Sequence, residues 1–81
     1  MNNLQQLKKI FAEGLGINED AVTDDLTYRS VKQWDSIGHM ALIAAIETQF
    51  DIMMDTDDII DMSSLAKAKE IIQKYEIDIN A

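Results

Sequence analysis

The sequence contains no cysteine and no proline, and it has only three glycines and one histidine. Without cysteine, the chain forms no disulfide and offers neither a thiolate nucleophile nor a thiolate metal ligand. The scarcity of proline and glycine argues against a turn-rich all-β fold and favours helices. With His39 as the single histidine, few combinations of residues remain for acid–base or nucleophilic catalysis.

Basic residues are also scarce, since 7 lysines and arginines stand against 15 aspartates and glutamates, for a net charge of −8. This charge repels nucleic-acid phosphates and anionic membranes, so neither is expected as a partner. A partner with a basic patch is the natural complement. The alternative is that the charge only keeps a small protein soluble.

Long hydrophobic runs are missing too. No apolar run approaches the roughly 20 residues that span a membrane, and the N-terminal segment MNNLQQLKKI lacks the apolar centre of a signal peptide. We therefore expect a cytoplasmic monomer without membrane insertion. Its 81 residues are expected to form one domain, residues 1–81.

Apolar residues recur at helical spacing in three segments and predict an all-α fold, a small four-helix bundle. The three main helices are expected over residues 3–15, 36–50 and 65–75, and one short helix within 55–62. Gly14 and Gly16 are the stop signal of the first helix. Ser63 or Ser64 is the expected N-cap of the last helix.

Residues 17–35 show no sustained period and predict a long loop between helices one and two. We expect four apolar residues to pin this loop to the core: Ile17, Val22, Leu26 and Val31. The segment EIDINA, residues 76–81, is expected to fray.

Two catalytic or metal sites can be set aside. Ser36 and His39 lie one helical turn apart, but His39 falls on the predicted core face and no third group completes a hydrolase. The acidic segment 51–62 fails the EF-hand pattern, because Thr56 and Met62 stand where glycine and glutamate are needed.

Ser36 begins the strongest predicted helix and has two interpretations. Aspartate and serine are good N-caps, so Ser36 can simply start the helix. However, a helix N-terminus also favours an attached phosphate. The face after Ser36 carries the apolar Ile37 and Met40, which is typical of a docking surface.

The segments LGINEDAVTDDLTY, QWDSIGHMALIAAIETQFDI and DMSSLAKAKEII resemble the acyl carrier proteins of the phosphopantetheine-binding family. The family's Asp-Ser-Leu signature reads Asp35-Ser36-Ile37 here. The resemblance covers essentially the whole chain. It implies that Ser36, flanked by Asp35 and Ile37, carries a covalent 4′-phosphopantetheine whose thiol holds acyl groups as thioesters. The chain would then be a carrier and not an enzyme, which fits the absence of cysteine.

The resemblance also implies the partners. They are a phosphopantetheinyl transferase, and acyl-loading ligases, synthases and acyltransferases of fatty-acid, polyketide or specialised lipid and surface-polymer biosynthesis. The expected partner surface comprises Ile37, Met40, Glu47, Asp51, Asp57, Asp58 and Asp61. The expected acyl pocket, between the second, third and fourth helices, comprises Ile46, Met54, Ile59, Met62 and Ala68.

The sequence departs from the family's common pattern in several places. Ile37 replaces the usual leucine, and Met54-Asp55 replaces a frequent proline before the third helix. These departures favour a dedicated carrier over one for general fatty-acid synthesis. Two alternatives stay open: an aminoacyl or peptidyl carrier, and an unmodified acidic helical interaction module in which Ser36 is only a cap.

Overall fold

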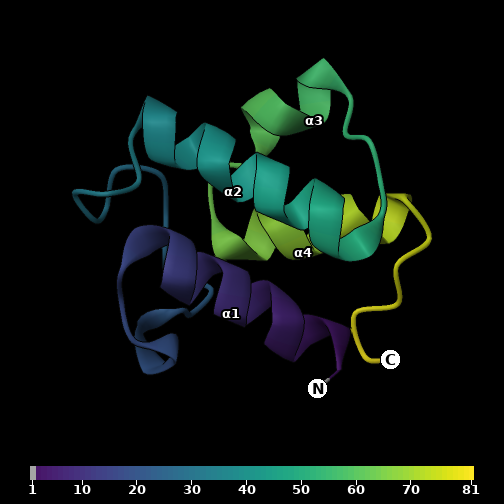
Figure 1. Cartoon of the computed structure of the whole chain (residues 1–81), viewed down its shortest axis with the longest axis horizontal. Coiled ribbons are helices and arrows are strands. Elements are labelled where there is room, and N and C mark those ends of the chain that lie inside the picture. The colour runs from purple at the N-terminus through teal and green to yellow at the C-terminus, as the bar shows by residue number, and fades with distance from the viewer. Residues whose placement is uncertain (1) are drawn as a thin grey trace.

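A computed structural model describes residues 2–81, which form four α-helices and no named strand (Figure 1). The elements in chain order are α1 (Asn3–Leu15), the 3₁₀ turn η1 (Glu19–Ala21), α2 (Ser36–Phe50), α3 (Thr56–Asp61) and α4 (Leu65–Lys74). This arrangement confirms the predicted all-α bundle with three main helices, one short helix and a long loop between the first two.

α1 has a defined start and a defined end. The Asn2 side chain accepts a hydrogen bond from the Gln5 backbone N–H at 2.8 Å, and the Gln5 side chain accepts one from Asn2 N at 3.0 Å. This reciprocal capping box satisfies amides that have no partner within the helix. The helix ends where Gly16 adopts a left-handed φ of 66°.

The core joins the three main helices, as the apolar periodicity predicts. Leu42 and Ile46 of α2 are fully buried, in one cluster with residues of α1 and α4: Leu7, Phe11, Leu65, Ala68 and Ile72. Phe50 is half-buried and packs against this cluster. In Figure 1 the short helix α3 lies on the side of α2 that faces away from α1.

The long loop is anchored at several points. Val22 and Leu26 are buried, and Ile17 and Val31 are half-buried against the core, as predicted. The loop backbone is also tied to the start of α4, because Tyr28 N donates to Ser63 O at 2.8 Å and Leu65 N donates to Leu26 O at 3.0 Å. The segment that leads to Ser36 is therefore held in place.

The C-terminal segment differs from the prediction that it frays. Asn3 N donates to Ala81 O at 2.7 Å, and Leu4 N donates to Ile79 O at 3.1 Å, so residues 76–81 fold back onto the start of α1. Ile77 and Ile79 pack half-buried against the core. Figure 1 shows the C-terminal segment running back to the start of α1. The segment is ordered because it satisfies the first amides of α1 and buries two isoleucines.

Candidate functional site

The N-cap of α2 is Asp35, and this separates the two interpretations of Ser36. The Asp35 carboxylate accepts a hydrogen bond from Gly38 N at 2.8 Å. Ser36 is therefore the first helical residue, and its exposed hydroxyl has no hydrogen-bond partner within residues 2–81. Asp35 alone supplies the side-chain cap, so the Ser36 hydroxyl takes no part in capping.

Gly38 allows the loop to press against the first turn of α2. A Cβ atom built on Gly38 would lie 2.0 Å from the carbonyl oxygen of Gln33, much closer than real contacts allow. No residue with a side chain fits here unless the loop moves. The absence of a side chain at Gly38 thus permits the close approach of the Gln33 backbone to the first turn of α2.

Trp34 and His39 link the loop, α2 and α3. The indole N–H of the fully buried Trp34 donates to Nδ1 of His39 at 3.0 Å. Because an indole nitrogen can only donate, Nδ1 accepts and the proton of the neutral ring lies on Nε2. Nε2 donates in turn to the Ile59 carbonyl of α3 at 2.7 Å. Both ring nitrogens are engaged, which supports the exclusion of a Ser36–His39 hydrolase.

Trp34 is not among the site residues predicted from the sequence. Its ring packs edge-on against Phe11, with centroids 5.3 Å apart, and against Tyr28 at 6.2 Å. Trp34 is part of the hydrophobic core and directly precedes Asp35 and Ser36, so the core extends to the start of α2. The signal that could have revealed it is a single large aromatic at the end of a polar loop.

An apolar cavity of about 340 Å³ opens beside Ser36, between α2 and α3. It is lined by Tyr28, Ser36, His39, Met40, Ile59, Ile60, Met62 and Ser63. Of the five expected pocket residues, only Ile59 and Met62 line it. Ile46, Met54 and Ala68 are buried in the core and line none of the cavities found in residues 2–81, so their part in an acyl pocket stays a prediction. The side chains of the core close the deeper space, so the cavity lies nearer the serine.

A second cavity, of about 440 Å³, borders Ser36 from the side of the loop. Its lining is Arg29, Val31, Lys32, Trp34, Asp35 and Ser36. Ser36 is therefore the residue shared by an apolar cavity and a cavity that carries two cations.

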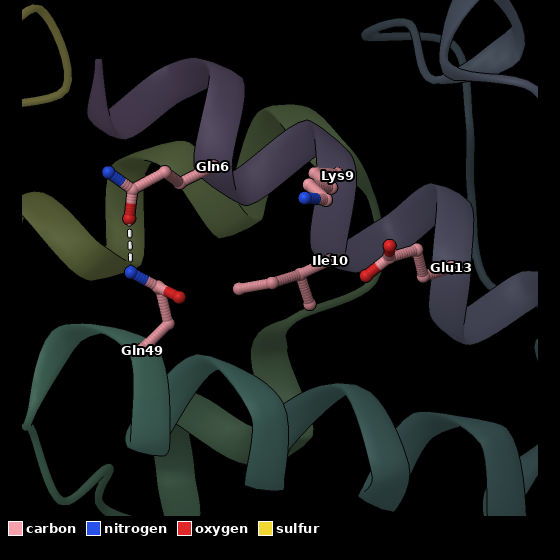
Figure 2. A pocket seen from close by; sticks show the side chains of 5 residues that line it. All are labelled: Gln6, Lys9, Ile10, Glu13 and Gln49. Atoms are coloured by element: carbon pink, nitrogen blue, oxygen red, sulfur yellow. Dashed lines mark hydrogen bonds between the residues drawn. The ribbon is translucent and has the colours of Figure 1, made fainter. Parts of the chain in front are cut away.

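Figure 2 shows another cavity, between α1 and α2, lined by Gln6, Lys9, Ile10, Glu13 and Gln49. The Gln49 side-chain amide donates to the Gln6 amide oxygen across it. None of these residues contributes to the two cavities at Ser36, and none is among the site residues predicted from the sequence. We attach no function to this cavity.

The expected partner residues are exposed with two exceptions. Ile37 is 82% exposed and Met40 54%, which is unusual for large apolar residues. Asp51, Asp57 and Asp61 are exposed carboxylates. Glu47 is half-buried, and its carboxylate accepts a hydrogen bond from Met54 N at 2.9 Å.

Asp58 differs most from the expectation, because it is only 5% exposed and cannot form part of an open acidic surface. Lys74 Nζ donates to one of its carboxylate oxygens at 2.5 Å, and the Tyr75 hydroxyl donates to the other at 2.6 Å. Tyr75 also accepts a hydrogen bond from Asp55 N at 2.8 Å. Asp58 therefore fastens α3 to the end of α4.

These contacts shift the ionisation of all three groups. The hydrogen bond from Lys74, followed by that from Tyr75, lowers the pKa of Asp58 below its ordinary value. The hydrogen bond to Asp58 raises the pKa of Lys74 and also that of Tyr75. The described residues contain no group of three or more histidine, aspartate or glutamate side chains placed to hold a metal ion.

The chain is thus a small helical bundle with an exposed serine as the first residue of α2. Residues 5–72 match the family described as "Phosphopantetheine attachment site". The chain is 30% identical over 76 residues to the acyl carrier protein of Buchnera aphidicola subsp. Baizongia pistaciae (strain Bp), covering 93% of this chain and 97% of that protein. It is 29% identical over 78 residues to that of Buchnera aphidicola subsp. Acyrthosiphon pisum (strain Tuc7), covering 95% and 98%.

The chain belongs to the phosphopantetheine attachment family. It is a carrier protein and not an enzyme, its prosthetic group is 4′-phosphopantetheine, and its partners are enzymes. The exposed, unpartnered hydroxyl of Ser36 and the cavities on both sides of it suit such a group. None of the helices in residues 2–81 has the length and apolar character needed to cross a membrane.

Proposed function

We propose that Ser36 carries the 4′-phosphopantetheine, that the thiol of this group holds acyl groups as thioesters, and that the chain presents them to biosynthetic enzymes. The observation that carries the proposal is the capping of α2 by Asp35, which leaves the hydroxyl of Ser36 exposed and unpartnered. A serine needed as the cap would have its oxygen engaged by a backbone amide.

Attachment requires little chemistry from this chain. The Ser36 Oγ attacks the phosphorus of coenzyme A that bears the pantetheine, and a new P–O bond forms. The P–O bond within the diphosphate breaks, and adenosine 3′,5′-bisphosphate leaves. Because His39 is engaged on both ring nitrogens, we assign removal of the hydroxyl proton to a base of the phosphopantetheinyl transferase.

The apolar cavity supports an acyl cargo over an aminoacyl one. Met40, Ile59 and Met62 line it, and methionine adapts to aliphatic guests. An aliphatic chain that leaves water gains roughly 0.8 kcal/mol per buried methylene before reorganisation. An aminoacyl group would bring an ammonium into the same lining, where its desolvation is unfavourable.

Exposed residues of α2 and α3 support docking of an enzyme with a basic patch. Ile37 and Met40 are the apolar contacts, and Asp57 and Asp61 supply negative charge from α3. We assign this surface to the transferase and to the enzymes that load or receive the cargo. Fatty-acid, polyketide or specialised lipid and surface-polymer biosynthesis would supply such enzymes.

The test is the intact mass of the protein after reaction with coenzyme A and a phosphopantetheinyl transferase. We expect one adduct on the wild-type chain and none on Ser36→Ala, whose helical circular dichroism should stay unchanged because Asp35 still caps α2. An unmodified wild-type chain, or an adduct that persists in Ser36→Ala, would contradict the proposal. The first outcome would favour the unmodified interaction module.

A further inference from the structure

The two cavities that meet at Ser36 differ in chemistry. The α3 side is lined mainly by Met40, Ile59, Ile60 and Met62, whereas the loop side carries the cations Arg29 and Lys32. A group attached to Ser36 lies at the boundary between the two. Any part of it that is charged and any part that is apolar thus meet different surroundings.

Arg29 and Lys32 are available for an anion. Neither side chain forms an ion pair or a hydrogen bond with any other residue of the described chain, although aspartates and glutamates outnumber basic residues. By contrast, Lys69 and Lys74 are paired with Asp24 and Asp58.

The backbone that bears the two cations is well defined. Arg29 adopts a left-handed φ of 68°, and its N–H donates to Trp34 O at 3.0 Å, which closes the segment between them into a loop. The Ser30 hydroxyl donates to Thr27 O at 2.6 Å. Anchoring by the buried Trp34 holds this loop beside α2.

One carboxylate lines the same cavity and opposes an anion. Asp35 is half-buried, and one of its oxygens is occupied by the hydrogen bond from Gly38 N. Two cations therefore face one carboxylate that is engaged in capping. The lining is net positive in a chain whose overall charge is −8.

We propose that the cavity lined by Arg29 and Lys32 holds the phosphodiester that joins 4′-phosphopantetheine to Ser36. This inference rests on the proposed modification of Ser36. The planar guanidinium of Arg29 suits two phosphate oxygens, and the ammonium of Lys32 acts as a point charge. With the phosphate held on the loop side, the remainder of the group passes toward the apolar cavity.

The experiment compares apo and modified forms of three full-length proteins. They are the wild type, Arg29→Gln with Lys32→Gln, and a control, Lys8→Gln with Lys9→Gln, which removes the same charge from α1. The first readout is the difference in melting temperature between modified and apo protein. The second is the NMR signal of the Arg29 side-chain Nε–H in the wild type and in the control.

We expect modification to shift the Arg29 signal in both proteins. The melting difference should be smaller in the Arg29/Lys32 variant than in the wild type, because a group bound only by the folded state stabilises it. The control should keep the wild-type difference. The inference would be overturned if the melting-temperature difference between modified and apo protein were equal in all three proteins. It would also be overturned if the NMR signal of Arg29 did not shift on modification.

A titration of the apo wild type with inorganic phosphate separates two sources of the anion. Only a weak shift of the Arg29 signal is expected at millimolar phosphate, because the phosphodiester is tethered at high effective concentration and free phosphate is not. A full shift with free phosphate and none on modification would assign the cavity to free anions and reject the proposal. Intact mass reports separately whether Ser36 was modified at all, so failure of the proposed function is recognised independently.

Discussion

The indole nitrogen of Trp34 lies 3.0 Å from Nδ1 of His39, and the two rings are nearly parallel, at 13°. This geometry is that of a hydrogen bond in the plane of both rings. His39 passes the connection to the Ile59 carbonyl, so one side chain joins the loop before Ser36 to α3. The loop lines the cavity that carries Arg29 and Lys32, and α3 lines the apolar cavity; Ser36 borders both.

His39→Leu tests this connection. It leaves the Trp34 N–H and the Ile59 carbonyl without a partner, so we expect a loss of about 1–3 kcal/mol in the free energy of unfolding. His39→Gln is the matched control, because its amide can still donate to Ile59. Urea denaturation measures stability, and amide hydrogen exchange in α3 should accelerate more in the leucine variant. Equal stability of the leucine variant and the wild type would show that the connection contributes nothing.

Gly38→Ala tests the close approach of the loop to α2. Alanine normally stabilises a helix relative to glycine by roughly 0.5–1 kcal/mol. Here the new Cβ would meet the backbone of Gln33 at 2.0 Å, so we expect a net loss of stability and a shift of the loop. Gly14→Ala is the control, because its Cβ would meet only the Leu42 side chain, at 2.8 Å, which can rotate. If Gly38→Ala proves as stable as Gly14→Ala, the loop is not held as described.

The lowered pKa of Asp58 makes the free energy of unfolding depend on pH in the acid range. Its pKa in the folded state is lowered below the ordinary 3.8, so the unfolded chain binds the proton more readily. The contribution of Asp58 is therefore complete above about pH 4 and is lost as the pH falls through the lowered folded value. Asp58→Asn should flatten this acid limb, and Asp57→Asn, an exposed neighbour, should leave it unchanged. Thermal melts between pH 2 and 7 provide the measurement.

At alkaline pH the stability of the fold changes in the opposite direction, falling as the pH rises. The pKa of Tyr75 and that of Lys74 are raised in the folded state by the hydrogen bonds to Asp58. Folded protein thus retains these protons longer, and stability falls as the pH rises above the ordinary values of 10.0 and 10.5. Tyr75→Phe should remove the tyrosine part of this decline, which melts between pH 8 and 11 would record. A decline of unchanged size in Tyr75→Phe would contradict the assignment.

Charge reversal tests the partner surface. Asp57→Lys combined with Asp61→Lys should slow loading by the transferase and reduce its dependence on salt, because exposed charges act mainly on the encounter rate. Each change should contribute about 0.2–1 kcal/mol. Glu19→Lys with Asp20→Lys in η1 is the control of equal charge. Equal slowing in both proteins would place the docking surface elsewhere.

The cavity between α2 and α3 predicts that cargo stabilises the fold. A medium-length acyl form should melt higher than the free-thiol form, because apolar surface enters the cavity only in the folded state. Ser63→Phe, which places a ring at the cavity lining, should shrink that difference. Ala44→Phe, on an exposed position of α2 outside the lining, should not. Identical melting temperatures of the acyl and free-thiol forms would mean that the cargo stays in solvent.

Local patterns were enough to predict the helices and the place of the serine. Leu7 and Phe11 recur at the helical period, and this period alone indicates which face of α1 is buried. In α2 the apolar residues extend round the helix, from the buried Leu42 and Ile46 to the exposed Ile37 and Met40, so its period marks a helix but not its buried face. Asp35-Ser36 marks the start of the central helix because short polar side chains cap orphan amides. Both signals are read within a few residues of the chain, so no knowledge of the fold is needed.

Only the tertiary structure decided what surrounds Ser36 and which acids face solvent. α3 has six residues, too few for a period to distinguish its faces, and Asp58 turns inward because Lys74 and Tyr75 arrive from α4. The cavities likewise depend on residues far apart in sequence, such as Tyr28 and Ile59. Burial of a charge and the shape of a cavity are properties of several elements packed together, so composition and periodicity cannot supply them.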